Sequence, residues 1–152
     1  MKKILNKICF FSLMNIKSIS DAVIKATKKN TLKKIIPLKN KDYLKKYPYI
    51  LIIQSETEKC IKITIYPQKT TNITKLVIQT SLEDKDLFKE IPRILKEYDI
   101  LHAPGLLKIG DVFIYECYIN LKPNSTKAGE LLKKLKKFSK QSLLFSIEKI
   151  KS

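Results

Sequence analysis

The sequence has few of the residues on which several common kinds of protein depend. Its 152 residues include three glycines, one histidine and no tryptophan. The glycines, Gly105, Gly110 and Gly129, are too scattered to form a loop that cradles a phosphate. The one histidine, His102, has no serine or cysteine at a recognisable motif spacing, so we interpret it as structural. We therefore predict that the chain is not an enzyme and uses no cofactor.

Cysteine is scarce as well. Cys9, Cys60 and Cys117 form an odd, widely spaced set without a Cys-x-x-Cys pair. This spacing argues against a disulfide framework and against a structural zinc site. The acidic group at residues 83–86 is interpreted as a complement to a helix dipole and not as a metal site. We expect three buried thiols in a reducing, cytoplasmic environment.

Arginine and acidic residues are both rare beside lysine. The chain has 31 basic and 14 acidic residues, a net charge of +17, and Arg93 is its single arginine. Such a charge favours a polyanionic partner. The lack of arginine favours a solvated lysine surface instead, because the guanidinium fork is the usual ligand of phosphates and base edges. Nucleic-acid binding, if present, would use two lysine strips: Lys39, Lys41, Lys45 and Lys46, and Lys133, Lys134, Lys136 and Lys137.

Long apolar runs are also missing from the N-terminus. Residues 1–3 are followed by an apolar stretch at 8–14 that imitates a signal peptide but is too short to cross a bilayer. We expect a retained apolar helix, with a cleaved export signal and a true start at Met14 as the alternatives. The prediction is a cytoplasmic protein without a membrane span.

The segment that follows has a helical pattern. Ser18 and Asp21 have the spacing of an N-terminal helix cap, and Ala22, Val23 and Ala26 lie on one side of the helix that would follow. We therefore predict two regions, a basic helical segment with a linker at residues 1–48 and a folded α/β domain at residues 49–152.

From residue 49 the apolar pattern is typical of strands that alternate with helices. Strands are predicted at residues 49–54, 60–66, 73–80, 100–107, 111–121 and 143–147, with helices at 82–98 and from 123 to 138. Pro92 is expected to kink the first helix. Phe113 and Tyr115 are expected in the core and Tyr118 on the exposed face of its strand.

From residue 73 the predicted order is strand, helix, strand, strand, helix, strand. This order is typical of a ferredoxin-like α+β domain, an antiparallel sheet with two helices on one face. We expect residues 49–66 to form an extra N-terminal β-hairpin that extends the sheet or lies beside it, with the helical N-terminal segment as a further extension.

In element order, residues 73–150 resemble ACT-type regulatory domains and, equally, RNA-recognition domains. The first resemblance implies an amino-acid ligand in the turn after the first strand, where residues 81–85 carry no glycine. The second implies stacking aromatics on the first and third strands. Residues 76–79 have none, whereas the third strand has several.

These observations lead to three hypotheses of function. The first is a non-enzymatic regulatory or adaptor protein that associates with a protein partner, or with itself as a homodimer, through sheet edges. The second is a nucleic-acid-binding protein without sequence specificity. The third is a small-ligand sensor of the ACT type.

Overall fold

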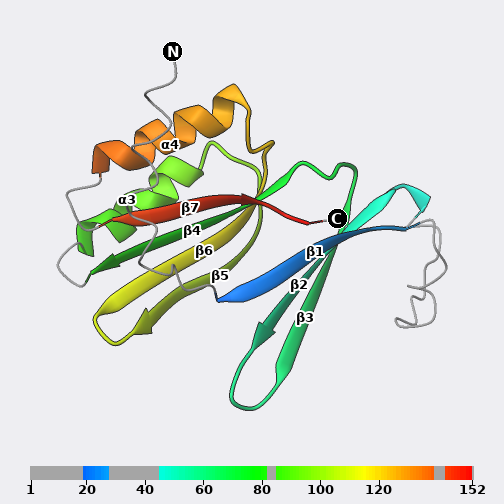
Figure 1. Ribbon diagram of the computed structural model, residues 1–152, viewed down its shortest axis with the longest axis horizontal. Coiled ribbons are helices and arrows are strands. Elements are labelled where there is room, and N and C mark those ends of the chain that lie inside the picture. The colour runs from blue at the N-terminus through cyan, green and yellow to red at the C-terminus, as the bar shows by residue number, and fades with distance from the viewer. Residues whose placement is uncertain (1–18, 28–44, 82–84, 139–142, 152) are drawn as a thin grey trace, which may run out of the picture.

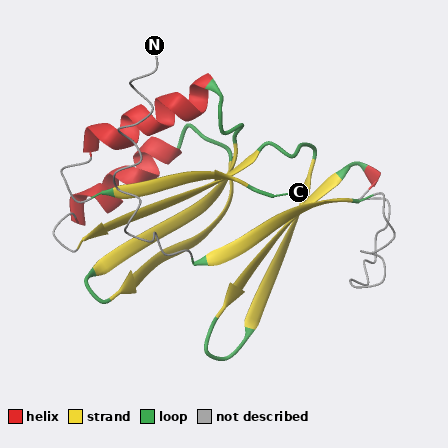
Figure 2. Cartoon of the chain, viewed as in Figure 1, coloured by secondary structure: helices red, strands yellow, loops and turns green. Residues whose placement is uncertain are grey.

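The computed structural model describes residues 19–27, 45–81, 85–138 and 143–151. Within these ranges the chain forms seven strands and two helices (Figure 1). The strands make two antiparallel sheets, one of three strands in the order β1-β2-β3 and one of four in the order β5-β6-β4-β7. The class is therefore α+β. Both helices lie over the four-stranded sheet, and the two sheets diverge from a common junction (Figure 2).

The three-stranded sheet comes from the first part of the chain. It consists of β1 (Ser20–Ala26), β2 (Tyr49–Glu56) and β3 (Ile61–Gln68). β2 and β3 are the predicted hairpin, and their apolar residues do form strands. The hairpin pairs with β1 and not with the four-stranded sheet. Of its two expected placements, extension of that sheet was therefore wrong, and the hairpin belongs to a separate sheet.

The helix predicted after Asp21 was also wrong, because residues 20–26 form strand β1. Ala22 and Ile24 lie on one side of β1 and pack into an apolar cluster, whereas Asp21 and Lys25 are exposed. Pairing with the apolar strand β2 over the whole length of β1 outweighs the helix propensity of the alanines and lysine. The N-terminal apolar helix and most of the segment 1–48 lie outside the described residues.

The four-stranded sheet and its helices follow. Their bounds are β4 (Ile73–Ser81), α3 (Lys85–Leu95), β5 (Ile100–Ile109), β6 (Val112–Asn120), α4 (Thr126–Phe138) and β7 (Leu144–Lys149). All of these elements were predicted, to within a few residues. α3 runs through Pro92. Within the described ranges neither helix has the length and apolar character that a bilayer crossing requires.

The helices cover one face of this sheet through an apolar core. Ile91 and Leu95 of α3 and Leu131 and Leu135 of α4 pack with buried residues of β4 and β6. These positions recur at helical spacing, so each helix buries one apolar face against the sheet. Tyr115 packs against the same core, as expected.

The C-terminal end of the chain joins the two sheets. The N–H of Ile24 in β1 donates to the carbonyl of Lys151 at 2.9 Å, and the N–H of Ile150 donates to the carbonyl of Ile73 in β4 at 3.2 Å. A second apolar cluster fills the same junction and includes Ile24, Ile73 and Tyr118. The three-stranded sheet is thus fixed to the four-stranded one at one end and projects from it at the other (Figure 1).

Candidate functional site

A group of polar side chains lies at the junction and connects strands of both sheets. We call it the polar seam, and its members are Ser20, Tyr66, Lys75, His102, Glu116 and Tyr118. They come from β1, β3, β4, β5 and β6. The seam therefore connects strands of the three-stranded sheet with strands of the four-stranded one.

Glu116 is the centre of the seam. Its side chain is fully buried, and one carboxylate oxygen lies 3.3 Å from the Nζ of Lys75. The same oxygen accepts a hydrogen bond from the N–H of Ile19 at 2.8 Å, and the other accepts one from the hydroxyl of Ser20. Lys75, which is 5% exposed, also donates to the carbonyl of Ser20. A buried ion pair is tolerated when its remaining polar atoms are bonded in this way.

Tyr118 completes the buried part of the seam, and its expected exposure was wrong. The residue is 0% exposed, because the three-stranded sheet packs over the face of β6 on which it lies. Its hydroxyl lies 2.8 Å from the Oγ of Ser20, and the Nζ of Lys75 lies 5.6 Å from the centre of its ring. Burial raises the pKa of Tyr118, so the phenol stays protonated and can donate to Ser20.

His102 and Tyr66 form the half-buried edge of the seam. The Tyr66 hydroxyl lies 2.7 Å from the Nδ1 of His102 and connects β3 with β5. Burial lowers the pKa of His102, and the positive charge of Lys62 acts in the same direction, against the opposite influence of Glu116. A neutral ring can accept the Tyr66 proton at Nδ1. His102 thus connects β5 with β3 through this contact.

The side chains of the seam contact one another between the two sheets. Ser20 is 5% exposed, and its hydroxyl is bonded to Glu116 and Tyr118, so it is not presented to a substrate. An open depression of about 310 Å³ adjoins Ser20 and is lined by Asp21, Gln54 and Glu56 as well as Ile19. Within the described residues no group of three or more histidine, cysteine or acidic side chains is placed to hold a metal ion.

The cysteines differ in environment. Cys117 is buried in the core beneath the helices, and burial raises the pKa of its thiol to about 12. Cys60 is exposed at the end of the β2–β3 hairpin, where its N–H donates to the hydroxyl of Thr57 at 3.1 Å. The expectation of a buried thiol was therefore correct for Cys117 and wrong for Cys60, which is part of the hairpin turn. Cys9 lies outside the described residues.

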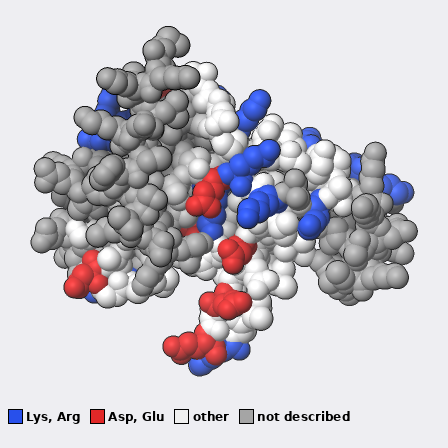
Figure 3. Space-filling view, viewed as in Figure 1, with Lys and Arg blue, Asp and Glu red and all other residues white. Residues whose placement is uncertain are grey.

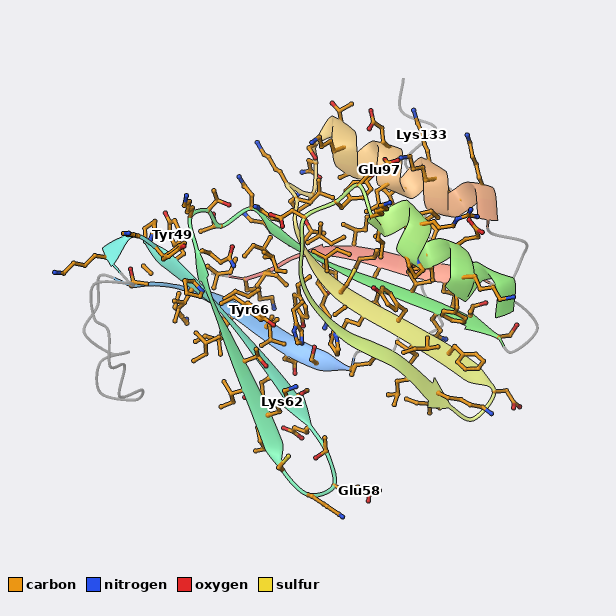
Figure 4. The ribbon with its side chains drawn as sticks, turned by 180° about the vertical axis from the view of Figure 1, so that it is seen from behind. Tyr49, Glu58, Lys62, Tyr66, Glu97 and Lys133 are labelled. Carbon is orange, nitrogen blue, oxygen red and sulfur yellow. The ribbon has the colours of Figure 1, made fainter. Side chains whose placement is uncertain are left out.

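The two predicted lysine strips lie far apart. Lys45 and Lys46 are exposed at one end of the molecule, and α4 lies at the other (Figure 1). On α4, Lys133, Lys136 and Lys137 are exposed, whereas Lys134 forms an ion pair with Glu97. Lys133 and Glu97 are labelled in Figure 4. Lys39 and Lys41 lie outside the described residues.

A different group of lysines comes together over the junction. Lys151 forms a parallel bridge with Val23 of β1, which places Lys149 and Lys151 beside the strand that carries Lys25. All three lysines are exposed, and Figure 3 shows blue side chains over this part of the molecule. They are distant in sequence, so only the pairing of β1 with the C-terminal end could have revealed the group.

Exposed apolar side chains gather on two strands. Among the described residues, the exposed large aliphatic side chains are Ile61, Ile63, Ile100, Leu106, Leu107 and Ile109. All six belong to β3 or β5, the strands at the free edge of the three-stranded sheet and at one edge of the four-stranded sheet. In Figure 4, β3 lies toward the viewer, with Lys62 and Tyr66 along it and Glu58 at the hairpin tip.

Comparison of the chain with family models, with curated proteins and with solved structures found no match.

Proposed function

We propose that the protein is a non-enzymatic adaptor that acts by protein–protein association through the edges of its sheets. One observation carries the proposal: every exposed large aliphatic side chain among the described residues lies on β3 or β5. An edge strand offers unpaired backbone N–H and C=O groups to another chain, and apolar side chains on that edge add buried area.

The proposal extends to the type of fold. We infer that residues 73–150 form a ferredoxin-like unit, and the strand order β5-β6-β4-β7 with both helices on one face supports this. The relation to ACT-type domains rests on element order and stays a prediction, as does the division of the chain at residues 48 and 49. In this arrangement the three-stranded sheet is an addition to the unit, and β3 is its outer edge.

Light scattering and affinity capture test the proposal on the full chain. Because association depends on concentration, scattering is measured from about 10 to about 200 µM. A defined dimer, or a defined complex with a captured protein, is expected. The double variant Ile63→Lys, Leu106→Lys changes both edges without touching the core, so it serves as the control that loses the complex. The proposal would be contradicted if the wild-type chain stayed monomeric at every concentration and captured only proteins that the double variant captures as well.

A second candidate is polyanion binding at Lys25, Lys149 and Lys151. The observation that favours it is the gathering of these exposed lysines over the junction, where Lys151 forms a bridge with Val23 of β1. Binding through phosphates predicts an affinity for any duplex or single strand that falls steeply between about 50 and about 200 mM salt. The triple variant to glutamine should weaken it uniformly across sequences. A chain that does not retard nucleic acid at about 50 mM salt would contradict this candidate.

A further inference from the structure

In strand β3, the backbone N–H and C=O groups of alternate residues point away from the neighbouring strand β2. The N–H of Thr57 donates to the carbonyl of Cys60 at 2.9 Å, which makes this a hydrogen-bonded pair at the end of the hairpin. Hydrogen-bonded and non-hydrogen-bonded pairs alternate along an antiparallel ladder, and the register of β2 with β3 has no shift. The N–H and C=O groups of Ile61, Ile63 and Ile65 therefore point away from β2, to an edge with which no other strand of the described residues pairs. We call it the open edge.

Two other observations indicate that the same residues of β3 direct their backbone groups away from β2. The carbonyl of Pro48 accepts from the N–H of Thr27 at 2.9 Å, so the even-numbered residues of the β2 segment bond toward β1 and the odd-numbered ones toward β3. Pro67 is one of the β3 residues whose backbone groups point away from β2, so its missing N–H removes no bond to β2. The open edge thus presents three consecutive donor–acceptor pairs before Pro67 interrupts it.

The side chains along this edge form an apolar row. Ile61 is 61% exposed and Ile63 is 58% exposed, and Ile65 lies on the same face of the strand. This face is opposite to the one from which Tyr66 contacts His102. The row therefore faces away from the junction, on the outer side of the three-stranded sheet.

The edge of β5 lacks this regularity. Pro104 has no N–H, Gly105 has a φ of +114°, and the register with β6 shifts on both sides of His102. Bulges and proline are devices that protect an edge strand from pairing with another chain. Leu107 and Ile109 share one face of β5 and Leu106 lies on the other, so the exposed apolar row of β5 has two residues and ends at Gly105. β3 is the edge that is built to accept another strand.

Local charge decides which partner fits β3. The whole chain carries +17, but the exposed residues of the hairpin include Glu56, Glu58, Lys59 and Lys62, which balance one another. Figure 3 shows acidic side chains along this projecting hairpin. A second copy of the chain can therefore approach the hairpin without direct repulsion, and an oppositely charged partner is not required.

We propose that β3 pairs with β3 of a second copy, antiparallel and centred on Ile63, so that two three-stranded sheets become one. In this register the two copies of Ile63 face each other, and Ile61 of each copy faces Ile65 of the other. All three outward pairs of backbone groups are then used. The inference rests on the proposed association function and names its partner.

The alternative registers are worse for physical reasons. A pairing centred on Lys62 places two lysines directly opposite each other, which is destabilising. A pairing centred on Thr64 places Pro67 opposite Ile61, and one centred on Ile65 places it opposite Ile63. Both lose a hydrogen bond, since proline has no N–H. The register centred on Ile63 places Lys62 opposite Thr64 and avoids both. Because one strand pair covers less than the ~800 Å² per partner of a standard interface, we expect a dimer with a dissociation constant of about 1–100 µM.

Disulfide trapping in the full chain tests the register. In a background with Cys9→Ser and Cys60→Ser, Ile63→Cys places two thiols at a directly opposed pair, where the Cα atoms lie about 5.5 Å apart and a disulfide can form. With oxidised glutathione we expect a covalent dimer on a non-reducing gel. Ile61→Cys and Ile65→Cys should each crosslink poorly alone and well when mixed. Ile109→Cys on the β5 edge is the matched control for collision. A yield for Ile63→Cys no higher than for Ile109→Cys would overturn the register.

Sedimentation velocity distinguishes a failure of β3–β3 pairing from a failure of the proposed adaptor function. Ile63→Lys should weaken dimerisation at least about tenfold, because it places like charges opposite each other at the centre of the pair. Leu106→Lys should leave dimerisation unchanged, and circular dichroism checks that both variants fold. A dimer that Leu106→Lys disrupts and Ile63→Lys does not would overturn pairing at β3 while the adaptor function stands. A monomer at all concentrations would overturn the second copy as partner, and affinity capture would then decide the function.

Discussion

The two sheets are stabilised by different means. The four-stranded sheet is covered on one face by α3 and α4, and their contact is an apolar core that includes Leu76, Leu131 and Leu135. The three-stranded sheet has no described helix on it and is fixed at its base by a small apolar cluster that includes Ile24 and Tyr118, by the polar seam around Glu116 and by backbone bonds near Lys151. The first sheet completes its own core. The second depends on its attachment and leaves an edge available to another chain.

The largest effect is expected where the attachment is broken. Glu116→Ala leaves Lys75 buried without its counter-charge and removes the acceptor of Ser20. We expect a loss of about 3–5 kcal/mol in the free energy of unfolding, measured by denaturant titration. Hydrogen exchange should speed up most in β1. A loss spread evenly over both sheets would contradict the separate role of the seam.

A matched control for this variant is the apolar replacement of both partners. Lys75→Met with Glu116→Leu removes the two charges together, so no uncompensated charge is left in the junction. This double variant should recover most of the stability that Glu116→Ala loses. If it were as unstable as the single variant, the cost would come from lost packing and not from an unpaired charge.

The helix-covered core should respond to a change in volume. Leu131→Ala opens a cavity between α4 and the sheet, where the leucine is fully buried. The expected loss is about 2–5 kcal/mol, with exchange accelerated in β4 and β6. The same titration measures it, and an effect below about 1 kcal/mol would mean that α4 does not seal this core.

A smaller effect is expected from a single hydroxyl in the seam. Tyr118→Phe keeps the ring, which packs in the junction, and removes the bond to Ser20. We expect a loss of about 0.5–1.5 kcal/mol. Tyr115→Phe is the matched control on the opposite face of the same strand, and it should cost less if the seam bond is what matters.

The smallest effect concerns pH. The pKa of His102 is lowered in the folded protein, so protonation below about pH 6.5 favours the unfolded state. The contribution of His102 is complete above that pH and declines as the pH falls through it. Denaturant titrations at several pH values should show a shallower decline for His102→Gln than for wild type. Identical slopes would show that the Tyr66 contact does not depend on ring charge.

The helix-covered sheet was predictable because its signals are local. The 3.6-residue spacing of Ile91, Ile94 and Leu95 identifies the inner face of α3, and the alternation in β6 identifies its core side. Ile61 and Ile63 likewise indicated a strand. Their exposure was not predictable, since alternation says which residues share a face and not what covers that face.

The seam was not predictable because its members are brought together by pairing. Ser20 and Glu116 are separated by 96 residues, and neither has a local pattern that signals the contact. The reading of Tyr118 as exposed failed for this reason, since it took the second face of β6 as free. Because a helix was expected at residues 22–26, strand β1 was not predicted. Without β1, neither the three-stranded sheet nor the junction can be deduced.

Amide hydrogen exchange along β3 tests the central claim most directly. In a monomer, the amides of Ile61, Ile63 and Ile65 face the open edge and exchange fast, whereas those of Lys62 and Thr64 are bonded to β2. Pairing predicts that the three isoleucine amides become protected as protein concentration rises, while protection of Lys62 and Thr64 stays the same. Isoleucine amides that exchange fast at every concentration would contradict association through this edge.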